Sequence, residues 1–433
     1  METMQKTPIA THRKTLDLTY SILRLCGCWV YDSDKLSLKL INVLVRFINW
    51  IIVTVILIAL FIDMTQNINN IEAVSDVIGF FAPLIVTLLK SIILQVLQKD
   101  IYSLINSIHK PIERLRYSSD LGVLTTIRTA IYYQNFDFTL FSSVLSVVTI
   151  VIFFISSEVS DTGLAMRGYF PLNETASPIF EIIFFMQLWT VFINCVWVAL
   201  FDLSLLGLIR WINVQIHILQ YNYKNCDPSI SKRDTLIMSN DTYLKIENYH
   251  FFKVPSKQFE INLFVPFKTS EMNIVDDSFI LRFKTCMKHH QRIIKSIDNY
   301  NTIFSFVLCV QIITTNAVAC FYLYETAWAI KHNKNYLKCF VMFGSVMVEL
   351  FYYCIFGSQL ITHAEMLRHS QYDSLWHNFL NRQVRDLMVN ALVISLKPLE
   401  IKAGYFFIFS VETFVSVLQK SYSYFAILNS LME

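Results

Sequence analysis

Residues 397–433 read KPLEIKAGYFFIFSVETFVSVLQKSYSYFAILNSLME, and within them Ala403–Leu428 predicts a membrane-spanning helix. The interval exceeds the length of about 20 helical residues that crosses a bilayer. On a helical wheel its side chains divide into an apolar and a polar face. The apolar face carries Phe407, Val411, Phe414, Val415, Leu418, Tyr422 and Phe425, and the polar face carries Glu412, Thr413, Ser416, Lys420, Ser423 and Ser430. A polar stripe inside a membrane must turn towards protein or water.

The polar stripe has two interpretations. Ile427 interrupts it near its end, and Leu431 follows one turn later. A polar lining with an apolar collar is what a water-filled pore with a dewetting gate requires. The alternative is a helix buried in its own bundle, whose Ser and Thr hydroxyls hydrogen-bond to neighbouring helices. The pattern by itself leaves both open.

The composition of the whole chain is that of an integral membrane protein. Of its 433 residues, 54% are hydrophobic and only 16% are charged, whereas soluble domains hold about 25% charged residues. The formal net charge of +3 is too small to indicate a nucleic-acid partner. The nine cysteines show no repeated spacing, which argues against a disulfide framework or a metal-binding knuckle.

Six further hydrophobic stretches predict membrane spans ahead of the last one. They cover Leu40–Ile62, Ala73–Leu97, Phe138–Ser156, Phe180–Ile209, Thr302–Tyr324 and Tyr336–Ile361. We therefore expect an all-α membrane protein with seven transmembrane helices. Lys and Arg are rich before the first span, absent after it and very rich between the fourth and fifth. The positive-inside rule then predicts a cytoplasmic N-terminus and an extracellular C-terminus.

These expectations divide the chain into consecutive segments. They are a cytoplasmic N-terminal segment (1–39), spans one to four (40–209), a cytoplasmic helical extension and loop (210–301), spans five and six (302–361), a cytoplasmic amphipathic anchor helix (362–402) and the seventh span (403–433). Helical periodicity through Tyr372, Trp376 and Phe379 predicts the anchor helix, and a similar pattern precedes the fifth span. The alternative for both is to lie flat on the inner leaflet. The sequon at Asn173 lies in a predicted extracellular loop and is open to glycosylation there.

Two polar stretches of the predicted cytoplasmic region show neither a regular helical period nor the spacing of a metal site. Residues 226–280 are interrupted by Pro, lack a helical period and predict an inserted flexible loop. The pair His289-His290 is expected on a solvated helix face, because adjacent helical residues diverge by about 100° and no further ligand is suitably spaced. We predict no metal site and no cofactor.

Sequence motifs for catalysis are missing. The chain contains no P-loop, HExxH, GxSxG or strand-associated GxGxxG, and we assign no catalytic residue. Ionisable residues within the predicted membrane region are scattered and do not form catalytic pairs: Asp76, Lys90, Glu181, Glu349, Glu412 and Lys420. Such residues often mark functional sites; an interhelical hydrogen bond is the alternative for Asp76, Glu349 and Glu412.

The C-terminal stretch resembles the signature of the insect odorant receptor family. The matching positions are Pro398, Leu399, Ala403, Gly404, Phe406, Phe407, Glu412, Thr413, Phe414, Lys420, Ser421, Tyr422 and Ser423. The helix around Tyr372 and Trp376 and the run His289-His290-Gln291 are similar to the family's as well. Together with seven spans and an inverted topology, the resemblance covers nearly the whole chain. Residues 226–280 depart from it, which points to a lineage-specific insertion or to retained intron sequence.

The resemblance implies an odorant-gated, non-selective cation channel in the plasma membrane of olfactory sensory neurons. Such receptors form tetramers, normally with the odorant co-receptor, and their last helix lines a central pore. On this chain the lining would be Glu412, Thr413, Ser416, Lys420 and Ser423, with a hydrophobic gate at Ile427 and Leu431 beside Ser430. Tyr372, Trp376 and Phe379 would lie at subunit contacts. The gate coincides with the break in the polar stripe, which favours the pore over the buried helix.

The resemblance also implies a ligand pocket in the outer half of the bundle, among spans two, three, four and six. That half contains Val77, Phe80, Phe81, Ile150, Phe153, Phe154, Phe184, Met186, Trp189, Met342, Phe343, Met347 and Tyr352. A cavity lined by aromatic and Met side chains suits a small volatile ligand. For any single member of the set, ordinary core packing or exposure to lipid is the alternative.

Three other classes of membrane protein have to be distinguished from an odorant receptor. A G-protein-coupled receptor shares seven spans, but the charge bias places the N-terminus inside and no DRY-like or NPxxY-like sequence is present. A gustatory-type receptor would form a channel without the co-receptor. A transporter would need internal repeats or paired broken helices, which the sequence does not show.

Overall fold

The computed structural model describes residues 12–30, 35–159, 163–164, 166–171, 176–248, 259–268, 271, 277–332 and 336–430. Its helices are α1 (Lys14–Leu25), α2 (Leu36–Gln66), α3 (Ile71–Val96), α4 (Gln98–Leu115), α5 (Leu121–Val159), α6 (Ile179–Lys224), α7 (Asn240–Glu247), α8 (Phe279–Lys331), α9 (Leu337–Tyr372), α10 (Arg382–Ser395) and α11 (Val411–Ser430). A 3-10 helix, η4 (Trp376–Phe379), precedes α10, and a hairpin of β1 (Lys402–Ala403) and β2 (Phe407–Ile408) precedes α11.

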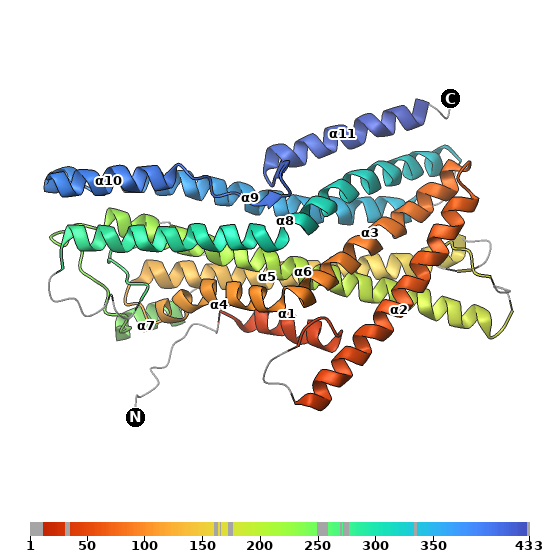
Figure 1. Ribbon diagram of the computed structural model, residues 1–433, viewed down its shortest axis with the longest axis horizontal. Coiled ribbons are helices and arrows are strands. Elements are labelled where there is room, and N and C mark those ends of the chain that lie inside the picture. The colour runs from red at the N-terminus through yellow and green to blue at the C-terminus, as the bar shows by residue number, and fades with distance from the viewer. Residues whose placement is uncertain are drawn as a thin grey trace.

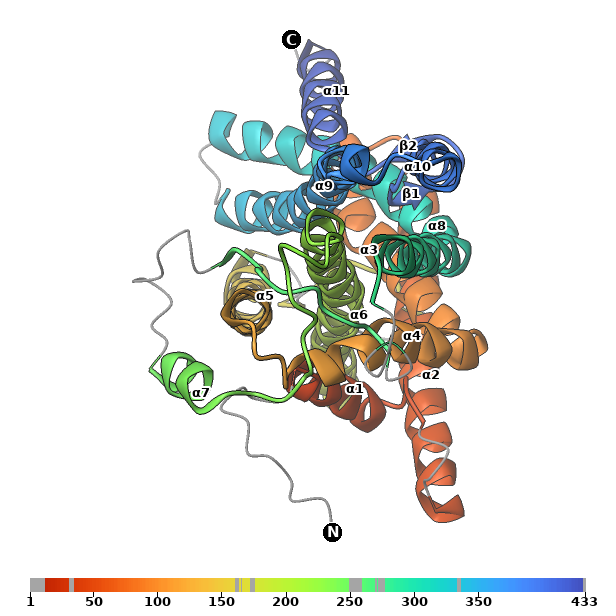
Figure 2. The same ribbon diagram turned by 90° about the vertical axis from the view of Figure 1, so that its left-hand side faces the viewer.

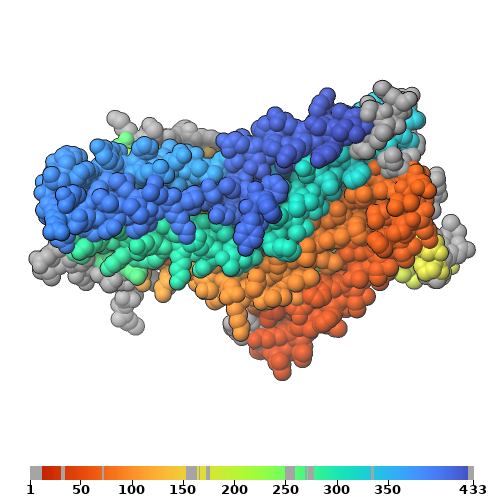
Figure 3. All heavy atoms as spheres, turned by 45° about the horizontal axis from the view of Figure 1, so that its top comes forward, coloured from red at the N-terminus to blue at the C-terminus, as the bar shows by residue number. Residues whose placement is uncertain are grey.

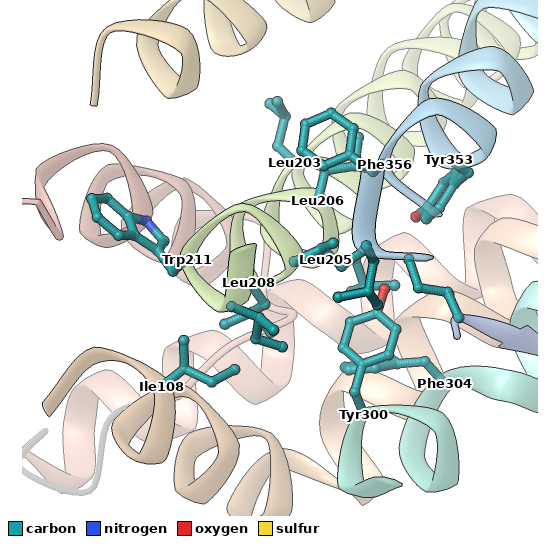
Figure 4. Packing of buried hydrophobic residues seen from close by; sticks show 14 of the residues in the cluster. Ile108, Leu203, Leu205, Leu206, Leu208, Trp211, Tyr300, Phe304, Tyr353 and Phe356 are labelled. Atoms are coloured by element: carbon teal, nitrogen blue, oxygen red, sulfur yellow. The ribbon is translucent and has the colours of Figure 1, made fainter. Parts of the chain in front are cut away.

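Most of the long helices lie lengthwise in one elongated bundle, and α2 runs obliquely across it (Figure 1). One end carries α7 and α10, and we call it the α10 end; the opposite end carries the α2–α3 and α8–α9 turns and the C-terminus. Figure 2, seen from the α10 end, shows α6 in the middle of the other helices. From Ala199 to Tyr223 its side chains are accordingly buried on nearly every side, including Phe201 and Trp211, whereas its first turns have exposed side chains such as Phe185. Figure 4 shows part of this core, where leucines of α6 lie among Ile108, Tyr300, Phe304 and Phe356.

Six of the described helices are long and apolar enough to cross a membrane. The intervals are Leu36–Gln66, Ala73–Val96, Leu121–Ile152, Ile179–Lys224, Phe279–Lys331 and Leu337–Tyr372. They coincide with the first six predicted spans, and the prediction of an all-α membrane protein is confirmed. Three of them, at 46, 53 and 36 residues, greatly exceed the length needed for one crossing. The parts of these three helices that exceed one crossing form the bundle at the α10 end.

The C-terminal helix begins later than predicted. The expected span from Ala403 instead opens with the β1–β2 hairpin, and α11 starts at Val411. Gly404 adopts φ +64° in the turn, and its N–H donates to the Ser305 carbonyl at 2.8 Å. The Ser410 hydroxyl then caps the helix by accepting from the Thr413 N–H at 3.2 Å. The remaining 20 residues of α11 still measure about 30 Å, the thickness of a bilayer core.

The predicted anchor helix over 362–402 is also divided. Helix α9 continues to Tyr372, after which Leu375 adopts φ +57° and η4 begins. The Asn381 side chain accepts from the Val384 N–H at 2.8 Å and starts α10 as a separate helix. Local turn and capping chemistry therefore overrides the continuous amphipathic pattern.

The described parts of residues 226–280 are packed, contrary to the expectation of a flexible loop. Phe264 and Val265 are fully buried. The Asn222 amide donates to the Val265 carbonyl and accepts from its N–H, both at 2.8 Å. The Asp120 carboxylate accepts from the N–H groups of Asn262 and Leu263. The segment covers α6 and α8 at the α10 end; that it is an insertion stays a prediction.

The pair His289-His290 is buried, so the expected solvated face is wrong. The two residues expose 1% and 2% of their surface. The packed segment covers His289, because the Phe267 ring stacks on it with centroids 3.5 Å apart. His290 lies instead against α9, where the Gln371 amide nitrogen is 3.4 Å from its Nδ1. Burial lowers the pKa of His290 to about 4 and that of His289 well below its usual value.

We predict that these histidines make the α10 end sensitive to acid. In the folded protein they stay neutral, whereas an unfolded histidine takes up a proton near pH 6.5. Stability is therefore complete above that pH and is lost as pH falls towards the folded pKa of about 4. For His290 the loss at pH 5.5 is about 1 kcal/mol. The thermal midpoint of the detergent-purified protein should drop between pH 7.5 and 5.5, and less so in His290→Gln. The same change at the exposed His377 serves as control; an equal drop in all three proteins contradicts the prediction.

Candidate functional site

A cavity of about 140 Å³ lies within the bundle. Its walls come from α3, α5, α6 and α9, the four helices of the predicted ligand pocket, together with Tyr322 of α8 and Met166 of the α5–α6 connection. The lining residues are Gly79, Phe80, Pro83, Leu84, Leu140, Phe141, Val144, Leu145, Val148, Ile152, Met166, Thr190, Val191, Asn194, Cys195, Val198, Ala199, Asp202, Tyr322, Met342, Ser345, Val346, Val348 and Glu349. The lining is mainly aliphatic and aromatic, which suits an apolar ligand.

The connection between α5 and α6 closes one end of the cavity. The Gln187 side chain holds the Met166 backbone, accepting from its N–H at 3.0 Å and donating to its carbonyl at 2.8 Å. Arg167 pairs with Asp63 of α2 at 3.1 Å. These polar ties fasten a short segment of chain across the helix ends, so that Met166 is 1% exposed.

An ionic cluster lies at the other end of the cavity. The Lys90 ammonium of α3 contacts the Asp202 carboxylate of α6 at 2.7 Å and the Glu349 carboxylate of α9 at 3.0 Å. The Gln311 amide of α8 donates to Glu349 at 2.6 Å, and the Tyr353 hydroxyl donates to Asp202 at 2.8 Å. The side chains of Lys90 and Asp202 are 1% and 0% exposed, and that of Glu349 is 20% exposed. Three charged groups are thus joined deep inside the apolar bundle.

This cluster corrects the expectation that these ionisable residues are scattered. Lys90 and Glu349 were singled out in the sequence, whereas Asp202, the residue between them, was missed. Asp76, another of those residues, also has a partner, since its carboxylate lies 2.7 Å from the Lys338 ammonium. In the described residues no three His, Cys, Asp or Glu side chains are grouped so that they could hold a metal ion.

Of the residues predicted for the pocket, Phe80 and Met342 line the cavity. Three others lie near the surface or in a shallow depression, since Ile150 and Trp189 are 55% and 44% exposed and Phe184 is half-buried. The rest with described side chains pack within the bundle outside the lining: Val77, Phe81, Met186, Phe343, Met347 and Tyr352. The side chains of Phe153 and Phe154 lie outside the described residues. The cavity is lined by the helices of the predicted pocket, but mostly by other residues of those helices.

A groove of about 660 Å³ runs between α8 and α11 on the outside of the bundle. Figure 3 shows the C-terminal segment, in dark blue, lying along that surface. The predicted pore-lining residues Glu412, Thr413, Ser416 and Lys420 all border the groove, as does Ile427. Ser423 is exposed beside it and donates to the Gln419 carbonyl. The side chain of Ser430 and all of Leu431 lie outside the described residues.

Helix α8 contributes to both the cavity and the groove. Tyr322 lines the cavity and donates to the Gly79 carbonyl of α3 at 2.8 Å. Gln311 reaches the ionic cluster, while the next residues, Ile312 and Ile313, border the groove. The Asn316 side chain of α8 accepts from Ser421 of α11 at 3.1 Å. The two hollow spaces therefore share one wall.

The predicted subunit-contact residues lie at the α10 end. Tyr372 is 66% exposed at the end of α9. Trp376 and Phe379 are half-buried, and the Phe379 ring stacks on Phe279 of α8 at 4.7 Å. Exposed apolar side chains continue along α10 at Val389 and Val393. The glycosylation position Asn173 falls outside the described residues.

Comparison with known protein families gives a match over most of the chain. The model of the 7tm odorant receptor family matches residues 70–422. Odorant receptor 2a of Drosophila melanogaster is 35% identical over 88 residues, or 20% of this chain and 22% of the relative. Odorant receptor Or2 of Anopheles gambiae is 22% identical over 149 residues, or 34% of this chain and 38% of the relative.

Other comparisons are structural. The chain superposes on the olfactory receptor OR5 from Machilis hrabei, solved in complex with eugenol, with a TM-score of 0.71 at 12% identity. That match covers 97% of this chain and 98% of the other. The fold is therefore shared over the whole length. The sequence matches to these curated relatives are shorter and span only 22% and 38% of the relatives' length.

We predict that removing the Lys90 ammonium destabilises the bundle. Lys90→Met leaves two carboxyl groups buried without their cation, and breaking a buried pair in this way costs about 3–5 kcal/mol. The yield and thermal midpoint of purified protein should fall sharply. The double variant Lys90→Met/Asp202→Asn, which removes one of those carboxylates, should recover part of the loss.

Lys338→Met provides a matched control. It removes the pair with Asp76, whose side chains are 14% and 30% exposed, and such pairs contribute less than buried ones. A Lys90→Met protein as stable as the control would show that the cluster does not hold the helices together.

Proposed function

The chain belongs to the odorant receptor family, a family of multi-pass membrane receptors rather than of enzymes, and we propose that it is the ligand-binding subunit of an odorant-gated cation channel. Its partner would be the odorant co-receptor, in a heterotetramer at the plasma membrane of olfactory sensory neurons. The N-terminus would be cytoplasmic and the C-terminus extracellular, as the distribution of Lys and Arg favours.

The ligand site of this proposal is the cavity among α3, α5, α6 and α9. Its apolar lining and enclosure by Met166 suit a small volatile molecule. A volume of about 140 Å³ is close to that of an engineered cavity of about 150 Å³ that binds benzene. The relative of the same fold was solved with eugenol, a small aromatic molecule.

The pore of this proposal is built from α11. One helix with a polar face cannot enclose water, so several subunits must each contribute one. Polar and charged side chains of α11 border an open groove, and α11 is attached mainly through α8 and α9. Ile427, 57% exposed on that helix, supplies the apolar constriction that dewetting requires.

The single observation that carries the proposal is the wall shared by cavity and groove. Tyr322 and Gln311 place α8 against the ligand site and its ionic cluster, and Ile312 and Ile313 place the same helix against α11. A ligand that favours one position of α8 would shift the closed–open equilibrium of the α11 helices. Gating then needs no contact between ligand and pore.

The function is tested by odorant-evoked current in cells that express this chain with and without the co-receptor. A broad panel of volatiles should evoke current only when both proteins are present. Current from this chain by itself would instead identify a self-sufficient, gustatory-type channel. No current from either combination, with the protein at the cell surface, would refute the channel proposal and return attention to G-protein coupling.

We predict that Ile427→Ala raises the current in the absence of odorant, because a smaller side chain weakens the dewetted constriction. Whole-cell recording with the co-receptor measures this directly. Val415→Ala is the matched control: Val415 is also β-branched and exposed on α11 but does not border the groove. An unchanged basal current in Ile427→Ala, or the same rise in both variants, speaks against a gate at this position.

A further inference from the structure

A second hollow, between α5 and α6, adjoins the cavity from the outside of the bundle. It has a volume of about 380 Å³, and we call it the lateral groove. Resting on the proposed function, we infer that small apolar ligands reach the cavity from the bilayer, and that the lateral groove is the site where they first bind. The inference comes from three side chains that line both the groove and the cavity.

The lateral groove lies at the depth of the membrane. Apart from Ile22 of α1, its lining runs from Phe138 to Ile150 on α5 and from Phe192 to Leu203 on α6, inside the predicted third and fourth spans. Ile150 and Phe192 expose 55% and 46% of their surface, and in a membrane such surface meets lipid acyl chains. The groove is thus open to solutes dissolved in the bilayer, where an apolar volatile is more concentrated than in water.

The hydroxyl groups of the lateral groove do not oppose an apolar occupant. Ser142, Ser146 and Thr149 line it, and each donates its proton to the carbonyl four residues earlier in α5, at 2.7–2.8 Å. A hydroxyl that is bonded to its own helix in this way needs no water. The groove therefore offers an apolar ligand a surface without unmet donors on α5.

The wall between the lateral groove and the cavity is thin. Leu145 of α5 and Cys195 and Ala199 of α6 border both spaces, so that at these positions the wall is one side chain thick. Cys195 and Ala199 are small and lie one helical turn apart on the same side of α6. The half-buried Leu145 therefore supplies most of the bulk. A change of its side-chain rotamer would join the two spaces.

The two ends of the cavity are closed more firmly than this wall. Opening the end at Met166 breaks its two hydrogen bonds to Gln187, at 3.0 and 2.8 Å. The other end is filled by the ionic cluster around Lys90. Polar groups that lose their partners inside a membrane are costly. The shared wall consists of two aliphatic side chains and a thiol, so opening it separates no ions and makes the lateral route the easiest.

Polar contacts next to the lateral groove hold α5 on α6 while the wall opens. The Trp211 indole N–H donates to the Gln134 side-chain oxygen at 3.0 Å. Arg210 pairs with Asp137, the residue directly before the groove begins on α5. A ligand can therefore pass by side-chain motion, without separation of the two helices.

The experiment places a reporter thiol in the cavity by Ser345→Cys, a nearly isosteric change at a residue that lines the cavity but not the lateral groove. The full-length variant, in phosphatidylcholine nanodiscs, is exposed to methyl methanethiosulfonate, a small neutral thiol reagent that dissolves in the bilayer. Peptide mass spectrometry follows the reporter separately from the natural cysteines. Adding Leu145→Ala should speed its modification about tenfold, which corresponds to a barrier lowered by about 1.4 kcal/mol. Adding Leu145→Trp should slow it.

Met166→Ala is the matched control, because Met166 lines the cavity at its closed end and does not border the lateral groove. It should leave the rate unchanged. Cys354 is 0% exposed and lines neither space, so an unchanged slow reaction there excludes general loosening. Leu145→Val replaces Leu145→Ala if the latter does not fold. A rate that rises with Met166→Ala and not with the change at Leu145 would overturn the inference.

Two further outcomes would overturn it as well. The charged trimethylammonium analogue of the reagent stays in water and should not reach the reporter; equal modification by both reagents would show an aqueous route. If Leu145→Ala speeds the reaction in detergent but not in nanodiscs, the lateral groove holds a lipid acyl chain and is not a site for the ligand.

Modification and current separate this inference from the proposed function. Modification that depends on Leu145, without any odorant-evoked current, would keep the lateral route and refute the channel. Odorant-evoked current together with modification that depends on Met166 would keep the channel and refute the lateral route.

Discussion

A lysine ammonium buried among apolar helices is the constraint on which the bundle depends. Inside a membrane, water cannot solvate Lys90, so its charge has to be met by protein groups. Asp202 and Glu349 meet it, and Gln311 completes the cluster at 2.6 Å from Glu349. These groups come from α3, α6, α9 and α8. Contacts of this length tolerate little sliding, so the cluster sets the register of four helices along the bundle axis.

The cavity and the groove follow from that register. Helix α6 lies in the centre (Figure 2), and the cavity lies between it and α3, α5 and α9. Helix α8 lies outside this layer and carries α11 on its other side. Under the proposed function, α8 would transmit a change at the cavity to α11.

The sequence predicts helices well and their faces poorly, and particular residues show why. Phe80 and Met342, predicted for the ligand pocket, line the cavity, whereas Met347 and Val77 of the same helices do not. These helices are apolar all round, so no hydrophobic stripe marks the side that faces the cavity. Asp202 carried a usable signal, a single carboxylate within a long apolar run. His289 and His290 carried none, since Phe267, more than 20 residues earlier in the chain, covers the first and Gln371 of α9 lies against the second.

By itself, the sequence determined that this is a multi-pass helical membrane protein, where six of its spans lie, and which side of its last helix is polar. These properties follow from hydropathy and helical period, which are local and add up along the chain. Only the tertiary structure decided that Lys90 meets Asp202 and Glu349, that Met166 closes a cavity, and that one helix borders both hollow spaces. Such pairings join residues 112 and 259 positions apart. They depend on how whole helices pack, because a side chain's partner is chosen by the neighbouring helix and not by its own segment.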